Sequence, residues 1–297
     1  MKTITSVLAA VDFSADSRRA AHRAALIAGR HKARLELLHV MSESSLDALR
    51  RLFGPSKPPG AALREGADRM LGEVATEIAA RDGIRAGRRI EVGEVVDAIL
   101  AASARASLLA IGARGLNPLR DTILGSTAVR LLGRRPGPVL VVKRAPRGPY
   151  RRILVPVDFS PHSVPALRLA RAIAPAAEIT VLHAYAVPFE GKLRYAGVSD
   201  EHLRALRAQA RAEAAGLLAG LCREAGLEGG PWRTALACGS AGRIILSRER
   251  STAADLVVIG KHGRSGIEKL LLGGVTRHVL ADATSDVLVV HEPDSAG

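Results

Sequence analysis

The chain has 297 residues, of which 47% are hydrophobic and 24% charged, a composition that excludes a wholly disordered protein and allows two domains. Lys and Arg outnumber Asp and Glu by 43 to 29, which gives a formal net charge of +14. A basic chain attracts polyanions, but aromatic residues are only 3% of the total, too few for a protein that stacks nucleic-acid bases. Nucleic-acid binding is therefore not expected.

The two cysteines predict neither a disulfide framework nor a metal site. Cys222 and Cys238 stand outside any CxxC pair, and no Cys/His cluster has the spacing of a zinc site. Unpaired cysteines fit a reducing compartment, so a cytoplasmic location is expected. No apolar run approaches the roughly 18 residues that a membrane span needs, so no membrane association is expected.

Apolar runs and helical patterns alternate along the first half of the chain. The expected elements are strand 4–11, helix 15–30, strand 34–40, a Pro/Gly-rich loop to about residue 60, helix 61–82, strand 86–92, helix 94–105, strand 107–112, helix 125–134 and strand 139–142. The second half repeats this order, with a long helix near 200–225. Near-continuous apolar strands that alternate with helices predict a parallel sheet covered on both faces, and hence a doubly wound, Rossmann-like α/β fold.

The two halves are copies of one domain. Val7–Ser14 matches Ile153–Ser160 at five of eight positions, at an offset of 146. Near the end of each half the offset is 148, where Val139–Val142 repeats as Val287–Val290. A Pro/Gly-rich segment, Arg144–Tyr150, joins them. We therefore expect two α/β domains, at 1–145 and 150–292.

A glycine pattern follows the fourth expected strand of each half. It reads G-x2-G-x9-G-[ST] at Gly112, Gly115, Gly125 and Ser126. Such glycines let the backbone approach a ligand and adopt positive φ, and a helix opening at Gly125-Ser126 would direct free N–H groups toward a phosphate. Ser126 could cap that helix or donate its hydroxyl group to a phosphate oxygen. The alternative is that the glycines only make turns. Neither a Walker A motif nor a G-x-G-x-x-G fingerprint is present.

Together these features resemble the universal stress protein family. The features that carry the resemblance are Asp-Phe-Ser after the first strand, Leu38-His39-Val40, the glycine pattern, the closing Val-Leu-Val-Val and the segment Asp255–Gly266. The resemblance implies a five-stranded parallel sheet of the adenine-nucleotide alpha-hydrolase-like type in each domain. It also implies that members carrying the glycine pattern bind ATP, ADP or AMP, with or without Mg²⁺.

The resemblance assigns nucleotide contacts residue by residue. In the first domain they are Ala10, Val11, Asp12, Val40, Gly112, Gly115, Gly125, Ser126, Thr127 and Ala128, and in the second Pro156, Val157, Asp158, Ala184, Gly260, Gly263, Gly273, Gly274, Val275 and Thr276. Arg114 and His262, inside the loops, are added because they could contact phosphate or point into solvent. Ala10 departs from the family's Pro, and Gly274 replaces its Ser/Thr. Without that hydroxyl, the second domain is expected to be the weaker phosphate site, with Thr276 and backbone donors remaining.

Two pairs of polar residues follow or end strands, and the first pair has two possible roles. Asp12 and Asp158 would either contact ribose, adenine or a phosphate-bound metal, or cap the following helix, for which Ser14 and Ser160 are better caps. His39 and His183 are expected to serve packing and hydrogen bonding.

No catalytic constellation is present, so an enzyme is not predicted. The expected function is that of an ATP-binding sensor or regulator in the stress response. The alternatives are an interaction scaffold with empty pockets and a slow ATPase. The closing strands, 139–142 and 287–290, are apolar sheet edges, which predicts an intramolecular pseudo-dimer and allows a homodimer. No motif identifies a protein partner.

Overall fold

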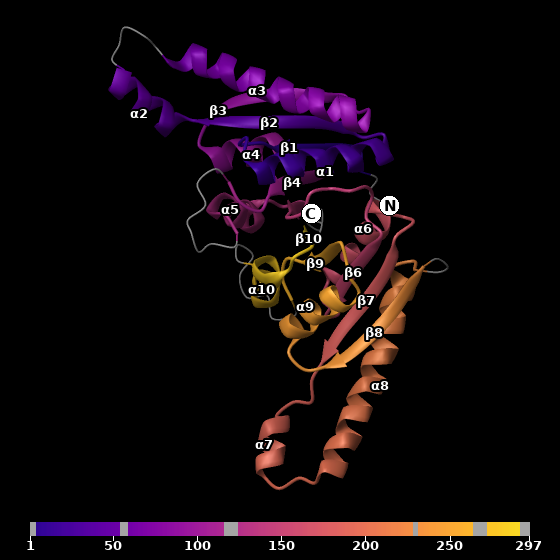
Figure 1. The fold of residues 1–297 in the computed structure, drawn as a ribbon. Coiled ribbons are helices and arrows are strands. Elements are labelled where there is room, and N and C mark those ends of the chain that lie inside the picture. Colours follow the sequence, from indigo (N-terminus) through magenta and orange to yellow (C-terminus); the bar gives the residue numbers. More distant parts are fainter. Residues whose placement is uncertain (1–3, 54–58, 116–123, 228–230, 264–271, 292–297) are drawn as a thin grey trace, which may run out of the picture. The chain divides into compact units, whose positions relative to one another are not determined.

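The computed structural model describes residues 4–53, 59–115, 124–227, 231–263 and 272–291. Its contacts divide the chain into two compact units. Unit 1 comprises Met1–Pro149 with Thr284–Val289 and Pro293–Gly297, and unit 2 comprises Tyr150–Ala283 with Val290–Glu292. Each unit holds one copy of the α/β alternation (Figure 1).

Unit 1 is built on a sheet with the order β3-β2-β1-β4-β5, all parallel, to which β10 adds an antiparallel strand. Its elements are β1 (Ser6–Ala10), α1 (Ala15–His31), β2 (Arg34–Ser42), α2 (Glu43–Phe53), α3 (Pro59–Asp82), β3 (Ala86–Gly93), α4 (Val95–Ser103), β4 (Leu108–Gly112), α5 (Ser126–Arg134), β5 (Val139–Val142) and most of β10 (Asp286–Val290). Helices α1 and α3 pack against each other, and so do α4 and α5. Right-handed crossovers place these two pairs on opposite faces of the sheet.

Unit 2 repeats this plan with the parallel order β9-β6-β7-β8. Its elements are β6 (Arg152–Val157), α6 (Ser163–Ile173), β7 (Glu178–Tyr185), α7 (Glu190–Tyr195), α8 (Asp200–Glu224), β8 (Trp232–Cys238), α9 (Ala241–Ser251), β9 (Leu256–Gly260) and α10 (Gly274–Asp282). The Lys261 N–H donates to the Val290 carbonyl oxygen (2.8 Å), which joins the end of β10 to this unit. The predicted fold class is confirmed for both copies.

The core is aliphatic, as the low aromatic content requires. Leu8, Leu37, Leu109 and Leu140, on four neighbouring strands of unit 1, are at most 1% exposed. The central strand is paired on both sides, since Val7 faces Leu35 of β2 and Leu108 of β4 in register. Continuous apolar runs form strands here because both faces of the sheet are covered.

One expectation about local structure was wrong, and one pairing was as expected. The segment between residue 40 and about residue 60 was expected to be a loop, but it contains helix α2. The amphipathic pattern of this helix was missed because turn-forming residues lie near it. The closing strand Val139–Val142, expected to be an apolar edge that pairs, has Leu140 paired antiparallel with Leu288 of β10. An apolar strand with an open edge is stabilised by a partner, and β10 supplies it within unit 1. This is the pairing that the sequence predicts for the two closing strands.

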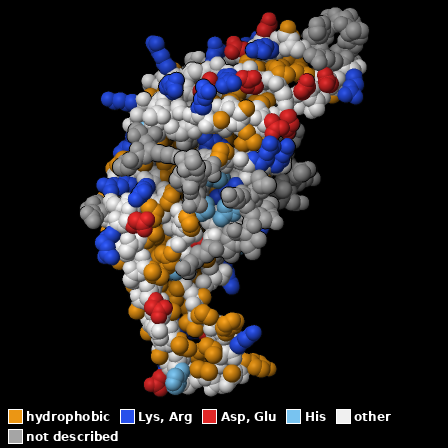
Figure 2. All heavy atoms as spheres, turned by 180° about the vertical axis from the view of Figure 1, so that it is seen from behind, with side chains coloured by type: hydrophobic (Ala, Val, Ile, Leu, Met, Phe, Trp, Pro, Cys, Tyr) orange, Lys and Arg blue, Asp and Glu red, His pale blue; other side chains and the backbone are white. Residues whose placement is uncertain are grey.

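Basic and acidic side chains are interspersed on the surface of unit 1. On the face that Figure 2 shows, Lys and Arg side chains lie among Asp and Glu side chains. Ion pairs join Arg18 to Glu77 (3.1 Å) and Arg89 to Glu91 (2.7 Å). Basic side chains are therefore interspersed with acidic ones on this face. Within the described parts of the chain, no helix is both long and apolar enough to cross a lipid bilayer.

Candidate functional site

The predicted ligand residues lie at the point where the strand order of each sheet reverses. In unit 1, β1 lies between β2 and β4, so Asp12 after β1 and Gly112–Gly115 after β4 come to the same edge. In unit 2, β6 lies between β7 and β9, which brings Asp158 beside Gly260–Gly263. Ligands of open α/β sheets bind at this switch point, outside the carboxyl ends of the strands.

A strained phenylalanine shapes the turn after the first strand of each copy. Phe13 and Phe159 have φ angles of 66° and 61°, in the left-handed region that bulky residues rarely occupy. The Phe13 ring lies 4.4 Å from the His39 ring, and His39 Nδ1 donates to the Val11 carbonyl oxygen (2.7 Å). In unit 2, Phe159 and His183 repeat the ring contact at 4.3 Å. The packing and hydrogen-bonding role predicted for the two histidines is present, and it stabilises the turn that orients the aspartate.

The two aspartates join that turn to the glycine loop. Asp12 Oδ1 accepts hydrogen bonds from the Ser14 N–H (3.0 Å) and the Ser14 hydroxyl group (2.6 Å). A Cβ atom built at Gly115 would lie 2.7 Å from Asp12 Oδ2, so any side chain there would displace the carboxylate. Asp158 and Gly263 repeat this approach at 2.7 Å. The carboxylates therefore face the loop, which places them at the candidate site.

The helix caps differ between the copies. Ser14 caps α1 by accepting from the Ser17 N–H (3.2 Å), as its sequence position suggests. In unit 2, the cap predicted at Ser160 is wrong, because α6 begins at Ser163 with His162 as its N-cap. The Ser163 hydroxyl group instead donates to Asp158 Oδ1 (3.3 Å). Neither aspartate is the N-cap of the following helix.

Two glycines are required by close approach, not by a positive φ as the sequence suggested. A Cβ atom at Gly112 would lie 2.7 Å from the backbone of Asp16 and Ser17 at the start of α1. A Cβ atom at Gly260 would lie 2.7 Å from His162 Cβ. Neither Gly112 nor Gly260 is among the positive-φ glycines of the described chain. Their lack of a side chain lets the fourth strand of each copy approach the start of its first helix.

The last helix of each copy begins next to the loop and has no side-chain cap. Helix α5 has Gly125 as N-cap and α10 has Gly273, and neither makes a side-chain cap bond. The Gly125 N–H donates to the Ala113 carbonyl oxygen (2.8 Å), which holds the helix start against the loop. The first-turn N–H groups at both helix starts are arranged as in anion sites.

Two predicted hydroxyl roles change in the structure. Ser126 is not the N-cap of α5 but its first helical residue, and it is exposed. Thr276 is buried and its hydroxyl group donates to the Gly260 carbonyl oxygen (2.8 Å). That hydrogen atom is engaged within the protein, so backbone N–H groups are the donors that remain at the start of α10. This arrangement corrects the expectation that Thr276 remains, with the backbone N–H groups, as a donor to phosphate.

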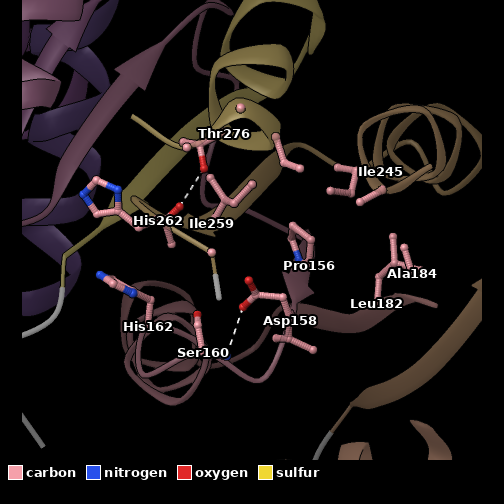
Figure 3. Close-up of a pocket in the computed structure, with 17 residues that line it drawn as sticks. Pro156, Asp158, Ser160, His162, Leu182, Ala184, Ile245, Ile259, His262 and Thr276 are labelled. Carbon is pink, nitrogen blue, oxygen red and sulfur yellow. Dashed lines mark hydrogen bonds between the residues drawn. The ribbon is translucent and has the colours of Figure 1, made fainter. Parts of the chain in front are cut away.

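The residues predicted in the second half line one cavity of about 160 Å³ in unit 2 (Figure 3). All eleven take part: Pro156, Val157, Asp158, Ala184, Gly260, His262, Gly263, Gly273, Gly274, Val275 and Thr276. Sequence reasoning missed six others: Ser160, His162, Leu182, Ala241, Ile245 and Ile259. Leu182 and Ile259 lie just before the carboxyl ends of their strands, and this position in the sequence could have identified them as lining residues. The contribution of α9 through Ala241 and Ile245 depends on tertiary packing.

The cavity has an apolar side and a polar side. Pro156, Leu182, Ala184 and Ile245 lie together on one side, and Asp158 lies between them and two imidazoles (Figure 3). The His162 and His262 rings are edge to face, with centroids 5.8 Å apart. Behind the loop, burial of the Lys261 side chain lowers the pKa of its amine below the usual range. Such a cavity suits a ligand with a flat apolar part and a polar part.

The predicted residues of the first half occupy equivalent positions in unit 1. Ala10, Val11 and Asp12 end β1, Val40 lies near the end of β2, and the others surround the end of β4 and the start of α5. Arg114 is exposed, and its carbonyl oxygen accepts from the Ser14 hydroxyl group (3.4 Å). The middle of each G-x9-G segment, and Arg264–Gly266 of the family-like segment, lie outside the described residues. Among those described, no cluster of three or more His, Cys, Asp or Glu side chains could hold a metal ion.

Comparisons with known proteins agree with this geometry. The family model described as the universal stress protein family matches residues 3–143 and again residues 149–291. A universal stress protein of Mycolicibacterium smegmatis is 29% identical over 304 aligned residues, which cover 96% of each chain. One of Mycobacterium tuberculosis is 26% identical over 225 residues, 72% of this chain and 73% of the relative.

A solved structure shows the same fold over the full length. The crystal structure of a universal stress protein from Archaeoglobus fulgidus covers 98% of this chain and 100% of its own, with a TM-score of 0.68 at 21% identity. The duplicated sequence, the switch-point geometry and the two family matches lead to one conclusion. The chain belongs to the universal stress protein family and carries two such domains in tandem.

Proposed function

We propose that this protein binds an adenine nucleotide, with ATP as the first ligand to test, and acts as a sensor or regulator in the stress response. One observation carries the proposal: the ten residues that the family resemblance assigns to the second domain, together with His262, line a single cavity at its switch point. Their counterparts in unit 1 follow the equivalent strands, and the aspartate and three of the glycines are the same residue types there: Asp12, Gly112, Gly115 and Gly125. The sites proposed are those predicted from the sequence, in domains at 1–145 and 150–292.

The cavity supports a specific orientation of the nucleotide. Its apolar side, with Pro156, Leu182 and Ile245, offers contact to an adenine ring. Asp158 would accept hydrogen bonds from ribose hydroxyl groups. At about 160 Å³ the cavity is smaller than the roughly 300–1,000 Å³ of typical ligand pockets, so the phosphates would extend along the glycine loop. There the start of α10 offers backbone N–H groups to them.

A nucleotide-bound Mg²⁺ fits this donor set. Mg²⁺ in nucleotide sites is held by one or two carboxylates, the phosphates and water, and Asp158 is the carboxylate that lines the cavity. Asp158 Oδ1 accepts from the Ser160 N–H (3.1 Å), and its Oδ2 faces Gly263. The ion would offset the repulsion between this carboxylate and a triphosphate.

Regulation, not turnover, is the proposed activity. The alternatives are a scaffold with empty pockets, which would bind no nucleotide, and a slow ATPase, which would bind ATP and release phosphate. The free thiols Cys222 and Cys238 support a reducing, cytoplasmic location. The antiparallel pairing of β5 with β10 supports an intramolecular pseudo-dimer.

The proposal is tested by the nucleotide content of the purified protein. The protein is denatured, released small molecules are separated by anion exchange with mass detection, and Mg-ATP is titrated into the nucleotide-free protein by calorimetry. We expect one or two adenine nucleotides per chain, from one competent site or two. No nucleotide and no heat of binding would support the scaffold. Phosphate release above that of a binding-deficient variant would support the slow ATPase.

Restoring the missing hydroxyl group should strengthen the second site. Gly274 stands where Ser126 stands in the first copy, and a Cβ atom built there has no neighbour within 4 Å. Gly274→Ser should therefore fit and donate to a phosphate. A hydrogen bond to a charged group contributes about 1.5–3 kcal/mol, so we expect the affinity for ATP to rise about tenfold or more. Calorimetry measures this, and Gly274→Ala, which adds the methyl group without the hydroxyl, should show no gain.

A further inference from the structure

Two imidazoles lie together at one end of the cavity in unit 2. The rings of His162 and His262 are edge to face, with their centroids 5.8 Å apart. Both residues line the cavity, His162 from the start of α6 and His262 from the loop after β9. Among the described residues that line it, the titratable side chains are these two and Asp158. This end of the cavity therefore carries donors and charge that its apolar side lacks.

Close backbone packing determines where both imidazoles are attached. A Cβ atom built at Gly260 would lie 2.7 Å from His162 Cβ, so the glycine lets the start of α6 approach the end of β9. A Cβ atom built at Gly273, the N-cap of α10, would lie 3.5 Å from His262 Cα. His162 is itself the N-cap of α6. Each imidazole is thus attached beside a helix start, where backbone N–H groups favour an anion.

The order of groups along the cavity places the imidazoles at the phosphate end of a bound nucleotide. The apolar side comes first, Asp158 follows it, and His162 and His262 lie beyond Asp158 (Figure 3). This inference rests on the proposed function, in which adenine contacts the apolar side and the ribose contacts Asp158. The phosphates of a nucleotide in that orientation extend from the ribose toward the two imidazoles.

The first copy has a different pair of residues at these positions. Asp16 stands at the His162 position and Arg114 at the His262 position. The Asp16 carboxylate pairs with Arg19 (2.7 Å). An ionised carboxylate accepts hydrogen bonds and donates none, so Asp16 could not donate to a phosphate. A pair of donors at this end is therefore a feature of the second site.

We propose that His162 and His262 bind the terminal phosphates of the nucleotide and make the second site selective for ATP over AMP. An imidazole donates one N–H group when neutral and two when protonated, so each ring can donate to a phosphate oxygen in either state. Hydrogen bonds to a charged acceptor are stronger than those between neutral groups. AMP carries only the phosphate attached to the ribose, so it would gain little from the imidazoles.

Calorimetry with Mg-ATP and with AMP tests the proposal on the full-length chain. Gly125→Leu is included throughout, so that the second site alone contributes. The double variant H162A/H262A should weaken ATP binding about tenfold or more and leave AMP binding within about twofold of the parent chain. Far-ultraviolet circular dichroism confirms that the variant is folded. H162D, which introduces the residue of the first copy, should weaken ATP binding more than H162A, because a carboxylate repels phosphate.

A matched variant controls for the loss of two histidines. His202 and His278 of unit 2 are exposed and do not line the cavity. H202A/H278A should therefore leave both affinities within about twofold of the parent chain. Equal weakening of ATP and AMP by H162A/H262A, or weakening of neither, would overturn the phosphate role of the imidazoles and leave the proposed function in place. No binding of ATP by the original chain would overturn both.

Discussion

Leucine at Gly125 is expected to abolish nucleotide binding in the first domain, and leucine at Gly273 to abolish it in the second. A Cβ atom at Gly125 would lie 3.5 Å from the Ala113 carbonyl oxygen, an ordinary contact, so the fold should tolerate a side chain there. The rest of the leucine would fill the space in front of the helix N-terminus. Losing two or three hydrogen bonds to phosphate should weaken binding roughly hundredfold or more.

Calorimetric stoichiometry with Mg-ATP measures the two effects separately. Each single variant should remove its own site and leave the other, and the double variant should bind nothing. Gly216→Leu is the control, because Gly216 lies in α8 with no atom within 4 Å of a built Cβ. If either site variant retains full stoichiometry and affinity, the phosphates do not lie at that helix start.

Replacing Arg135 by methionine is expected to destabilise unit 1 by about 3 kcal/mol. Arg135 is 3% exposed, and burial lowers its pKa to about 10. Its guanidinium group donates to the carbonyl oxygens of Pro138 (2.6 Å) and Ala106 (2.8 Å), and also to both oxygens of Ser103. Methionine fills the volume but removes all four of these hydrogen bonds; the Pro138 and Ser103 carbonyl oxygens keep the Leu109 and Ala106 N–H groups as donors, whereas the Ala106 carbonyl oxygen loses the guanidinium donor.

The neighbouring arginine supplies the control for this change. Arg134 is half-exposed and pairs with Asp97 at the surface, so Arg134→Met should cost less than about 1 kcal/mol. Urea denaturation followed by far-ultraviolet circular dichroism gives both free energies of unfolding. Equal losses in the two variants would mean that the hydrogen bonds of Arg135 do not stabilise the native state.

Much of the architecture was predictable because it depends on local patterns. The apolar runs around Leu8 and Leu109 are strands since both faces of the sheet are covered, and the glycine spacing predicts a loop that ends in a helix start. The internal repeat revealed the tandem domains, because a matching segment such as Ile153–Ser160 requires no knowledge of packing. Helix α2 was missed because turn-forming residues surround its periodic pattern.

Contacts between residues distant in sequence were decided by the tertiary structure. Asp158 faces Gly263 across 105 positions, and α9 contributes Ile245 to the same cavity. The Thr276 hydroxyl group is engaged by Gly260, which residue type alone could not reveal. The sequence by itself determined the family, the repeat and the candidate ligand residues, since these follow from residue order and spacing. Only the tertiary structure decided which hydrogen bonds are already made and which side chains line the same cavity, because both depend on distances that folding creates.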